Sequence, residues 1–360
     1  MGEKLSRKLV LENGKEFFGY GFGANTEAVV TLVFNTGVVG YQEILTDPSY
    51  TASGVVMSYP LIGNYGITDE DNESGSPTIG AMIVREYCDE PSNFRFTKTL
   101  SEVMEEYSIP GISGVDTRYL TEIIRENTGI RAIVTDTEVS TDEALEKIKN
   151  TPVDKNIVEK ISCKKKWYAR TARPEYSIVA IDCGIKHSII KALNKRRCNV
   201  TVVPYNTTAK EILKLNPDGI VISNGPGCPM NLPNVTETIK ALKGSVPMLG
   251  IELGFALIAN AYDVAWEKLD MAHAGGGIPI KNLETNRVTM SAQAHTYAVN
   301  IDSLRRNNLK PTHISVMDNT VEGFCDEEEK VIAVEFHPEG APGVQDNEYI
   351  FDEFLGMINR

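Results

Sequence analysis

The second half of the chain alternates short apolar runs with segments of helical spacing. The apolar runs are SIVAID (177–182), NVTVVPY (199–205), GIVI (219–222) and VPMLGI (246–251). The segments with helical spacing are 186–197, 208–215, Val235–Leu242 and Tyr349–Ile358. Strands buried on both faces are almost continuously apolar, and strands that alternate with helices form parallel sheets. We therefore expect a doubly wound, mostly parallel sheet here, with only short strands beyond Gly275.

The first ~140 residues have a different pattern, in which β-rich runs are separated by Gly, Pro and Asn turns. The runs are Lys8–Glu12, Val29–Asn35 and Gly54–Ser58. One helix is predicted at Thr117–Glu126, where Asp116 or Thr117 can cap the N-terminus. Its apolar residues Leu120, Ile123 and Ile124 are spaced for one buried face. This half is predicted to be an α+β domain.

The length and the change of pattern indicate two domains, because 360 residues exceed the usual ~100–200 of one domain. We place an N-terminal domain at 1–150, a linker at 151–176 and the second domain at 177–360. The expected linker contains KISCKKKWYARTARPEY, which is basic, aromatic and rich in turn formers. Lys164–Lys166 are interpreted as solvated linker residues, with a phosphate or partner contact as the alternative.

Charge and cysteine content exclude several classes of function. The chain has 36 basic and 49 acidic residues, a net charge of −13, which argues against binding to nucleic acid or anionic membranes. Its six cysteines are scattered without CxxC pairs or His/Cys clusters, so we expect free thiols in a reducing compartment and no metal site. Neither a signal peptide nor a membrane-spanning stretch is recognised, so a cytoplasmic protein is expected.

Two glycine-rich loops follow buried strands, at the edge where open parallel sheets bind ligands. In SNGPGCP, Gly225 and Gly227 bracket Pro226 and can turn N–H groups into a cleft, as in an oxyanion hole. The alternative is an ordinary strand-to-helix turn. In GIELGFA, Gly250 and Gly254 flank Glu252 in the G-x-nucleophile-x-G form of a strained elbow. Such an elbow presents its central side chain at a helix N-terminus, which favours a thiolate.

A third motif, VEFHPEG, places His337 at the end of an apolar strand and Glu339 two residues later. A histidine base oriented by a carboxylate is half of a nucleophile–His–acid triad. A His-Pro-Glu turn alone can also be structural. Because the motif follows a glycine-rich loop and an elbow in order, we interpret it as functional.

These segments resemble, nearly end to end, the small subunit of carbamoyl phosphate synthetase, a class I glutamine amidotransferase. In the N-terminal half the resemblance rests on FNTGVVGYQEILTDPSY, YPLIGNYG and GVDTRYLTEIIRENTG. In the C-terminal half it rests on SNGPGCP, the elbow, QAHTYAV and VEFHPEG. The resemblance implies a heterodimer in which this subunit hydrolyses glutamine and passes ammonia to a large synthetase subunit. It also implies a role in arginine or pyrimidine precursor supply, with no cofactor in this chain and ATP and Mg²⁺ on the partner.

The chain departs from the family pattern at the residues that perform this chemistry. The family elbow reads G-I-C-L-G-H-Q, whereas this chain has Glu252 in place of the nucleophilic cysteine and Ala256 in place of glutamine. In the family's Q-N-H-G-F stretch, Ala294 and Thr296 replace asparagine and glycine, and Tyr297 follows. The positions that match the family's glutamine-binding, oxyanion and His/Glu residues are Ser49, Gly225, Gly227, Leu253, His337 and Glu339.

These departures predict that glutamine hydrolysis is lost. A carboxylate attacks amides poorly, and its charge at Glu252 repels the oxyanion of the transition state. Ala256 and Ala294 remove substrate contacts worth roughly 1–3 kcal/mol each. We expect a structural or regulatory partner of a large subunit that uses free ammonia, with Glu252 ion-paired to protonated His337 and sealing the pocket.

Two other interpretations remain open. The chain could be a repurposed hydrolase in which Glu252 is the general base and His337 the acid, favoured by an apolar pocket that raises the pKa of Glu252. Cys228, in the glycine-rich loop, could be a relocated nucleophile, although a small buried thiol is the better expectation.

Overall fold

The computed structural model describes residues 5–359, which divide into two compact units. The first unit ends at Asp154 and the second begins at Lys155. Most of the expected linker therefore lies in the second unit and is structured: it contains α5 (Ile157–Ile161) and β10 (Trp167–Ala169). Val158 packs into the core, while Lys164–Lys166 form an exposed bend. The basic run Lys164–Lys166 suggested a solvated linker, so the short structured segments α5 and β10 on either side of it were not predicted.

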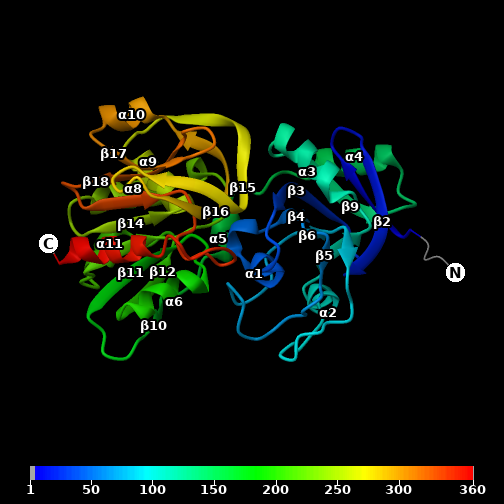
Figure 1. The fold of residues 1–360 in the computed structure, drawn as a ribbon, viewed down its shortest axis with the longest axis horizontal. Coiled ribbons are helices and arrows are strands. Elements are labelled where there is room, and N and C mark those ends of the chain that lie inside the picture. Colours follow the sequence, from blue (N-terminus) through cyan, green and yellow to red (C-terminus); the bar gives the residue numbers. More distant parts are fainter. Residues whose placement is uncertain (1–4, 360) are drawn as a thin grey trace. The chain divides into compact units, whose positions relative to one another are not determined.

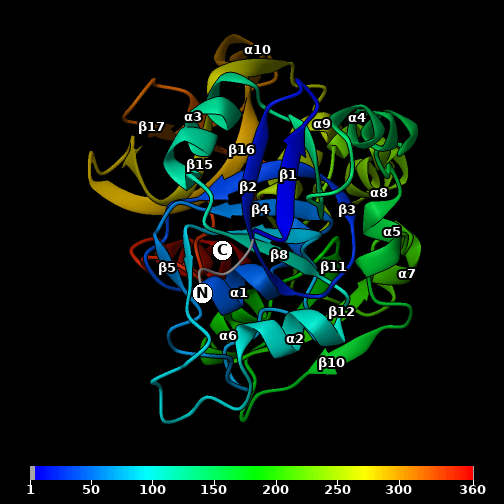
Figure 2. The ribbon, with the colours of Figure 1, turned by 90° about the vertical axis from the view of Figure 1, so that its right-hand side faces the viewer.

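The first unit is a closed barrel of seven strands in the order β1-β2-β8-β6-β4-β3-β9. The strands are β1 (Arg7–Leu11), β2 (Glu16–Gly23), β3 (Ala28–Asn35), β4 (Ser53–Met57), β6 (Ala81–Ile83), β8 (Pro110–Ser113) and β9 (Arg131–Asp136). A small sheet pairs β5 (Leu61–Ile62) with β7 (Glu86–Tyr87). Figure 2 shows β1 beside β2, its antiparallel partner. Closure removes the exposed sheet edges that an open sheet of this size would leave.

Helices pack around this barrel. They are α1 (Tyr41–Thr46), the 3₁₀ turn η1 (Pro48–Tyr50), α2 (Leu100–Glu106), α3 (Thr117–Glu126) and α4 (Thr141–Asn150). Helices α2, α3 and α4 bury one face each, whereas α1 is buried almost entirely. Helix α3 has the bounds that the sequence predicted, and the Asp116 side chain caps it by accepting from the Tyr119 N–H. Its residues Leu120, Ile123 and Ile124 are all buried, as expected.

The second unit is a ten-stranded sheet in the order β10-β12-β11-β13-β14-β19-β18-β16-β15-β17. The five strands from β12 to β19 in this order are parallel, and antiparallel strands extend the sheet on both sides. The remaining strands are β11 (Tyr176–Asp182), β12 (Cys198–Pro204), β13 (Gly219–Ile222), β14 (Met248–Ile251), β15 (Trp266–Asn282), β16 (Val288–Val299), β17 (Lys310–Ser315), β18 (Val321–Asp326) and β19 (Val331–Val334). The expected mixed α/β architecture is confirmed.

Helices cover both faces of this sheet (Figure 1). They are α6 (His187–Lys195), α7 (Ala209–Leu213), the 3₁₀ turn η2 (Pro229–Asn231), α8 (Pro233–Leu242), α9 (Leu253–Ala261), α10 (Ile301–Arg306) and α11 (Tyr349–Ile358). Apolar residues of α6 and α11 belong to one core cluster, and those of α7, α8 and α9 belong to another. Two separate cores on one sheet are the signature of a doubly wound fold.

The expectation of short strands beyond Gly275 is wrong. β15 and β16 form a long antiparallel hairpin of 17 and 12 residues. Register shifts on both sides of His273–Gly275 interrupt the pairing, so no regular apolar alternation runs along β15. Cross-strand hydrogen bonding with β16 therefore stabilises β15, although its own sequence pattern does not predict a long strand. Within residues 5–359, none of the helices has the length and apolar character needed to span a membrane.

Candidate active site

The elbow predicted at Glu252 is present between β14 and α9. Glu252 has φ 52° and ψ −106°, a conformation that a residue with a side chain rarely adopts. A Cβ on Gly250 would lie 2.6 Å from Cδ1 of Ile258, and a Cβ on Gly254 would lie 2.1 Å from the Ile222 carbonyl oxygen. Both glycines are therefore required by close packing, and they fix the strained turn that presents Glu252.

The SNGPGCP loop supplies a backbone donor to the elbow. The Gly225 N–H donates to Oε2 of Glu252 at 2.9 Å. A Cβ on Gly225 would lie 1.9 Å from the Cys183 carbonyl oxygen, so only glycine allows this approach. The donor that the sequence assigned to a developing oxyanion is thus hydrogen-bonded to a side-chain carboxylate.

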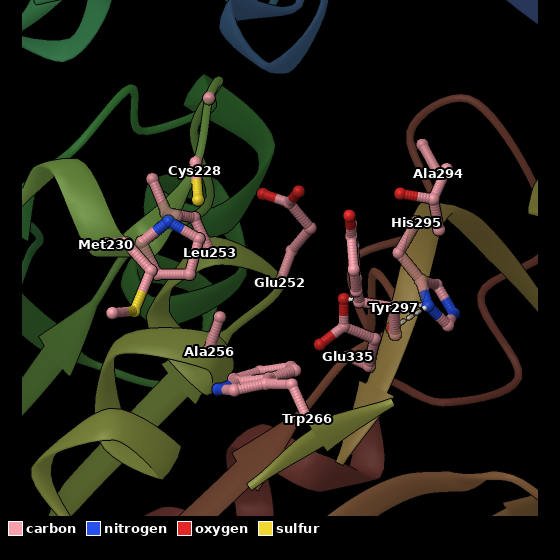
Figure 3. A pocket seen from close by; sticks show the side chains of 13 residues that line it. Cys228, Met230, Glu252, Leu253, Ala256, Trp266, Ala294, His295, Tyr297 and Glu335 are labelled. Carbon is pink, nitrogen blue, oxygen red and sulfur yellow. Dashed lines mark hydrogen bonds and ion pairs between the residues drawn. The ribbon is translucent and has the colours of Figure 1, made fainter. Parts of the chain in front are cut away.

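A cavity of about 370 Å³ lies beside the elbow. It is lined by Gly227, Cys228, Pro229, Met230, Glu252, Leu253, Ala256, Trp266, Ala294, His295, Thr296, Tyr297 and Glu335. Figure 3 shows Glu252 between Cys228 and Leu253 on one wall and Tyr297 and Glu335 on the other. A cavity therefore lies beside Glu252, and the expected ion pair between Glu252 and His337 stays a prediction.

Glu335 is a second carboxyl group in the cavity wall. It is buried, and burial raises its pKa well above the ordinary value; His295 opposes this effect, and the charges of Glu252 and Glu322 add to it. The neutral form of Glu335 is favoured because the cost of burying its charge outweighs the attraction of the His295 ring, whose Nδ1 lies 3.9 Å from Oε1 of Glu335. The remaining wall is largely apolar, including Met230 and Trp266.

The His337–Glu339 pair contains a third member, Lys186. Nδ1 of His337 lies 3.0 Å from Oε1 of Glu339, and Nζ of Lys186 lies 2.9 Å from the same oxygen. Burial alone would raise the pKa of Glu339, but the charges of Lys186 and His337 outweigh it and hold that pKa far below its usual range. Glu339 is therefore a stable anion that can orient the His337 ring. The backbone N–H of His337 also donates to the Ala292 carbonyl oxygen at 3.0 Å, which anchors the turn.

The other expected site residues fall into two groups. Six of them line the cavity with Glu252: Gly227, Leu253, Ala256, Ala294, Thr296 and Tyr297. Ser49 belongs to the first unit, where it lies in η1 and donates its N–H to Oδ1 of Asp47 at 2.8 Å. Cys228 is exposed at the cavity, so the expectation of a buried thiol is wrong.

Sequence patterns did not point to Lys186, Trp266 or Glu335. Glu335 precedes His337 by two positions in VEFHPEG, a spacing that could have placed both on one side of an extended segment. Lys186 follows β11 and reaches Glu339 only through folding, so no local signal identifies it. Trp266 begins the hairpin whose extent the sequence pattern did not show.

A glycine-flanked elbow after a parallel strand, a glycine-rich donor loop and an oriented histidine define the domain of a class I glutamine amidotransferase. The family model for glutamine amidotransferase class-I matches residues 179–357, and that for the carbamoyl-phosphate synthase small chain, CPSase domain, matches residues 9–134. The chain belongs to the carbamoyl phosphate synthase small chain family, which confirms the resemblance seen in the sequence.

Three relatives cover nearly the whole chain. The carbamoyl phosphate synthase small chain of Fusobacterium nucleatum is 43% identical over 99% of both chains. That of Bacillus caldolyticus is 44% identical over 99% of this chain and 97% of its own. The carbamoyl phosphate synthase pyrimidine-specific small chain of Bacillus subtilis is 42% identical over 98% of this chain and 96% of its own.

Proposed function

We propose that this carbamoyl phosphate synthase small chain homologue does not hydrolyse glutamine and acts as a structural or regulatory partner of a large subunit that uses free ammonia. One observation carries the proposal: the Glu252 carboxylate, at the centre of the elbow, accepts the hydrogen bond of the Gly225 N–H. From the resemblance of the motifs, Glu252 stands where the family has its cysteine nucleophile.

Acyl transfer at this site needs a nucleophile and a free donor for the oxyanion. The Gly225 N–H is hydrogen-bonded to Glu252, so a substrate carbonyl has to compete with a carboxylate 2.9 Å away. A tetrahedral intermediate would place a second negative charge beside the first in a site of low dielectric, where repulsion is strong. Attack by Glu252 itself would yield an anhydride, which is less stable than the thioester that a cysteine forms. Both steps disfavour glutamine hydrolysis.

Substrate binding is weakened at two further positions on the cavity wall. Ala256 and Ala294 line the cavity but offer no side-chain polar group for the amide or the amino-acid end of glutamine. Each lost hydrogen bond costs about 1–3 kcal/mol when its partner is left unpaired, so the two losses together correspond to orders of magnitude in affinity.

The partner follows from the family. A small chain implies a large chain, and we propose a cytoplasmic heterodimer in which the large chain holds ATP and Mg²⁺ and supplies carbamoyl phosphate for arginine or pyrimidine synthesis. The net charge of −13 agrees with a protein partner and disfavours nucleic acid.

The repurposed hydrolase is the weaker proposal. It requires Glu252 to accept a proton from water, but Oε2 of Glu252 already accepts a hydrogen bond from the Gly225 N–H. The cavity of about 370 Å³ is the one observation in its favour.

The decisive experiment measures glutamine hydrolysis by the purified chain, alone and with its cognate large subunit, and carbamoyl phosphate synthesis from glutamine or from ammonium. We expect synthesis from ammonium only. The triple variant Glu252→Cys, Ala256→Gln, Ala294→Asn should gain glutamine hydrolysis, whereas the matched control Ala256→Gln, Ala294→Asn should not. Glutamine-supported synthesis by the unmodified complex would refute the proposal.

A further inference from the structure

Two histidines and one glutamate from three strands of the second unit meet in its interior. His273 on β15 is the cross-strand partner of His295 on β16, and Glu322 lies on β18. All three are buried, and one potential ligand atom of each lies within 4.8 Å of the others. The sequence predicted no metal site because it lacks short ligand motifs, and these residues are too far apart along the chain to form one.

The distances suit a single ion bound between the three side chains. Nδ1 of His273 lies 3.0 Å from Oε1 of Glu322, and Nε2 of His295 lies 3.4 Å from Oε2 of the same carboxylate. Zn²⁺ bonds nitrogen and carboxylate oxygen at about 2.0–2.2 Å, so neighbouring donors in a tetrahedral set lie roughly 3.4 Å apart. Small side-chain shifts would complete the geometry.

Each histidine is held by an outer partner on its other ring nitrogen. Nε2 of His273 lies 2.8 Å from Oδ2 of Asp318, and Nδ1 of His295 lies 2.9 Å from the Tyr297 carbonyl oxygen. A histidine that donates to a carboxylate or carbonyl in this way turns its remaining lone pair to the metal. The outer partners therefore aim Nδ1 of His273 and Nε2 of His295 at Glu322.

The glutamate supplies an independent observation. Its side chain has no exposed surface, and within the described residues its Oε2 makes no hydrogen bond of good geometry; Nε2 of His295, 3.4 Å away, faces it. A buried carboxylate oxygen in this condition is costly unless a cation satisfies it. Oε1 of Gln293, 3.1 Å from Nε2 of His295, is a further oxygen donor beside the same space.

We propose that His273, His295 and Glu322 bind one divalent transition-metal ion, for which Zn²⁺ is the best match to two imidazoles and a carboxylate. The site adjoins the cavity, because His295 also lines it. The proposal does not rest on the fate of glutamine hydrolysis, since none of the three ligands belongs to the elbow, its donor loop or the His337–Glu339 pair.

The test is Zn²⁺ titration of the full chain after chelator treatment, followed by calorimetry and by competition with a chromophoric chelator. We expect one ion per chain. His295→Gln and Glu322→Gln should lower the affinity at least tenfold, and the outer variant Asp318→Asn should lower it about 10–100-fold. The control His313→Asn, at a buried histidine outside the cluster, should bind as the unmodified chain does.

Co²⁺ provides a second measurement that needs no variant. Bound to the unmodified chain, it should give the intense visible ligand-field bands of a four-coordinate site with nitrogen and oxygen donors. The competing explanation is an ion-pair network in which protons occupy the place of the metal. Three results would each overturn the metal site in favour of that network. They are failure of the unmodified chain to bind stoichiometric Zn²⁺, absence of the Co²⁺ bands, and undiminished Zn²⁺ binding by folded Glu322→Gln.

Discussion

Nζ of Lys186 lies 2.9 Å from Oε1 of Glu339, and both side chains are almost completely buried. The ammonium group also donates to the Ala341 carbonyl. This pair joins the loop after β11 to the turn after β19 and fixes the carboxylate that faces His337. A buried ion pair of this kind adds little net stability, because both charges lose their hydration, but it fixes the position of the two side chains. Removing one partner alone is strongly destabilising.

Removing only the cation should therefore be severe. Lys186→Met removes one of the two charges that hold the buried Glu339 as an anion and leaves it to His337, and we expect a loss of about 3–5 kcal/mol in the free energy of unfolding. Lys195→Met is the control, because its side chain is 64% exposed and surface pairs contribute little. Urea unfolding measures both. The double variant Lys186→Met, Glu339→Leu should recover most of the loss, and a single-variant loss below about 1 kcal/mol would contradict the assignment.

Acid should destabilise the second unit through His313. Burial lowers the pKa of His313 to about 4, and its Nε2 lies 2.7 Å from the Tyr349 hydroxyl oxygen. Since the folded pKa lies below the unfolded value of about 6.5, only the unfolded chain gains this proton between the two. The stability that the neutral His313 side chain contributes to the folded state is fully present above about pH 6.5. It is lost as the pH falls towards 4, which lowers the free energy of unfolding by about 3 kcal/mol in total. Unfolding measured across this window should show a smaller pH dependence for His313→Asn; equal slopes would exclude this role.

The packing at the elbow should make Gly254 irreplaceable. Gly254→Ala brings a Cβ to 2.1 Å from the Ile222 carbonyl oxygen, and we expect a loss of about 3 kcal/mol or more. Gly356→Ala in α11 is matched, because nothing outside the backbone of its own helix lies within 4 Å of the added Cβ. Gly356→Ala should raise the free energy of unfolding by about 0.5–1 kcal/mol. Thermal unfolding distinguishes the two, and a tolerated Gly254→Ala would show that the helix can move away from β13.

Backbone strain at Glu252 should appear when glycine is compared with alanine. Both Glu252→Gly and Glu252→Ala remove the carboxylate, but only glycine adopts φ 52° and ψ −106° without strain. We expect the free energy of unfolding of the glycine variant to exceed that of the alanine variant by about 1 kcal/mol. The reverse order would mean that the elbow relaxes once the hydrogen bond to Gly225 is gone.

The cap of α3 should account for a smaller effect in the first unit. Asp116 accepts from the Tyr119 N–H at 3.1 Å, and Asp116→Ala should cost about 1 kcal/mol. Asp116→Asn keeps an acceptor oxygen and should behave almost as the unmodified chain does. Chemical unfolding of both variants measures the difference, and equal losses would show that the charge matters more than the hydrogen bond.

Local chemistry was enough to predict much of this protein. The bounds of α3 and α11 agree with the predicted helices, because apolar spacing, and in α3 also the capping residue Asp116, specify a helix from neighbours alone. The elbow could also be predicted from the sequence, since Gly250 and Gly254 flank Glu252 at the spacing of a nucleophile elbow, and the structure leaves no room for a Cβ at either glycine. The identity of that residue, Glu252, raised the question of lost chemistry before any geometry was known.

Other features were decided only by tertiary structure. The hairpin of β15 and β16 exists because of cross-strand pairing, and it places His273 opposite His295. The contact between Lys186 and Glu339 joins distant segments, as does the place of Glu322 between two histidines. Sequence patterns report what a residue requires of its immediate neighbours, whereas a buried charge acquires its partner only when separate strands are brought into one sheet.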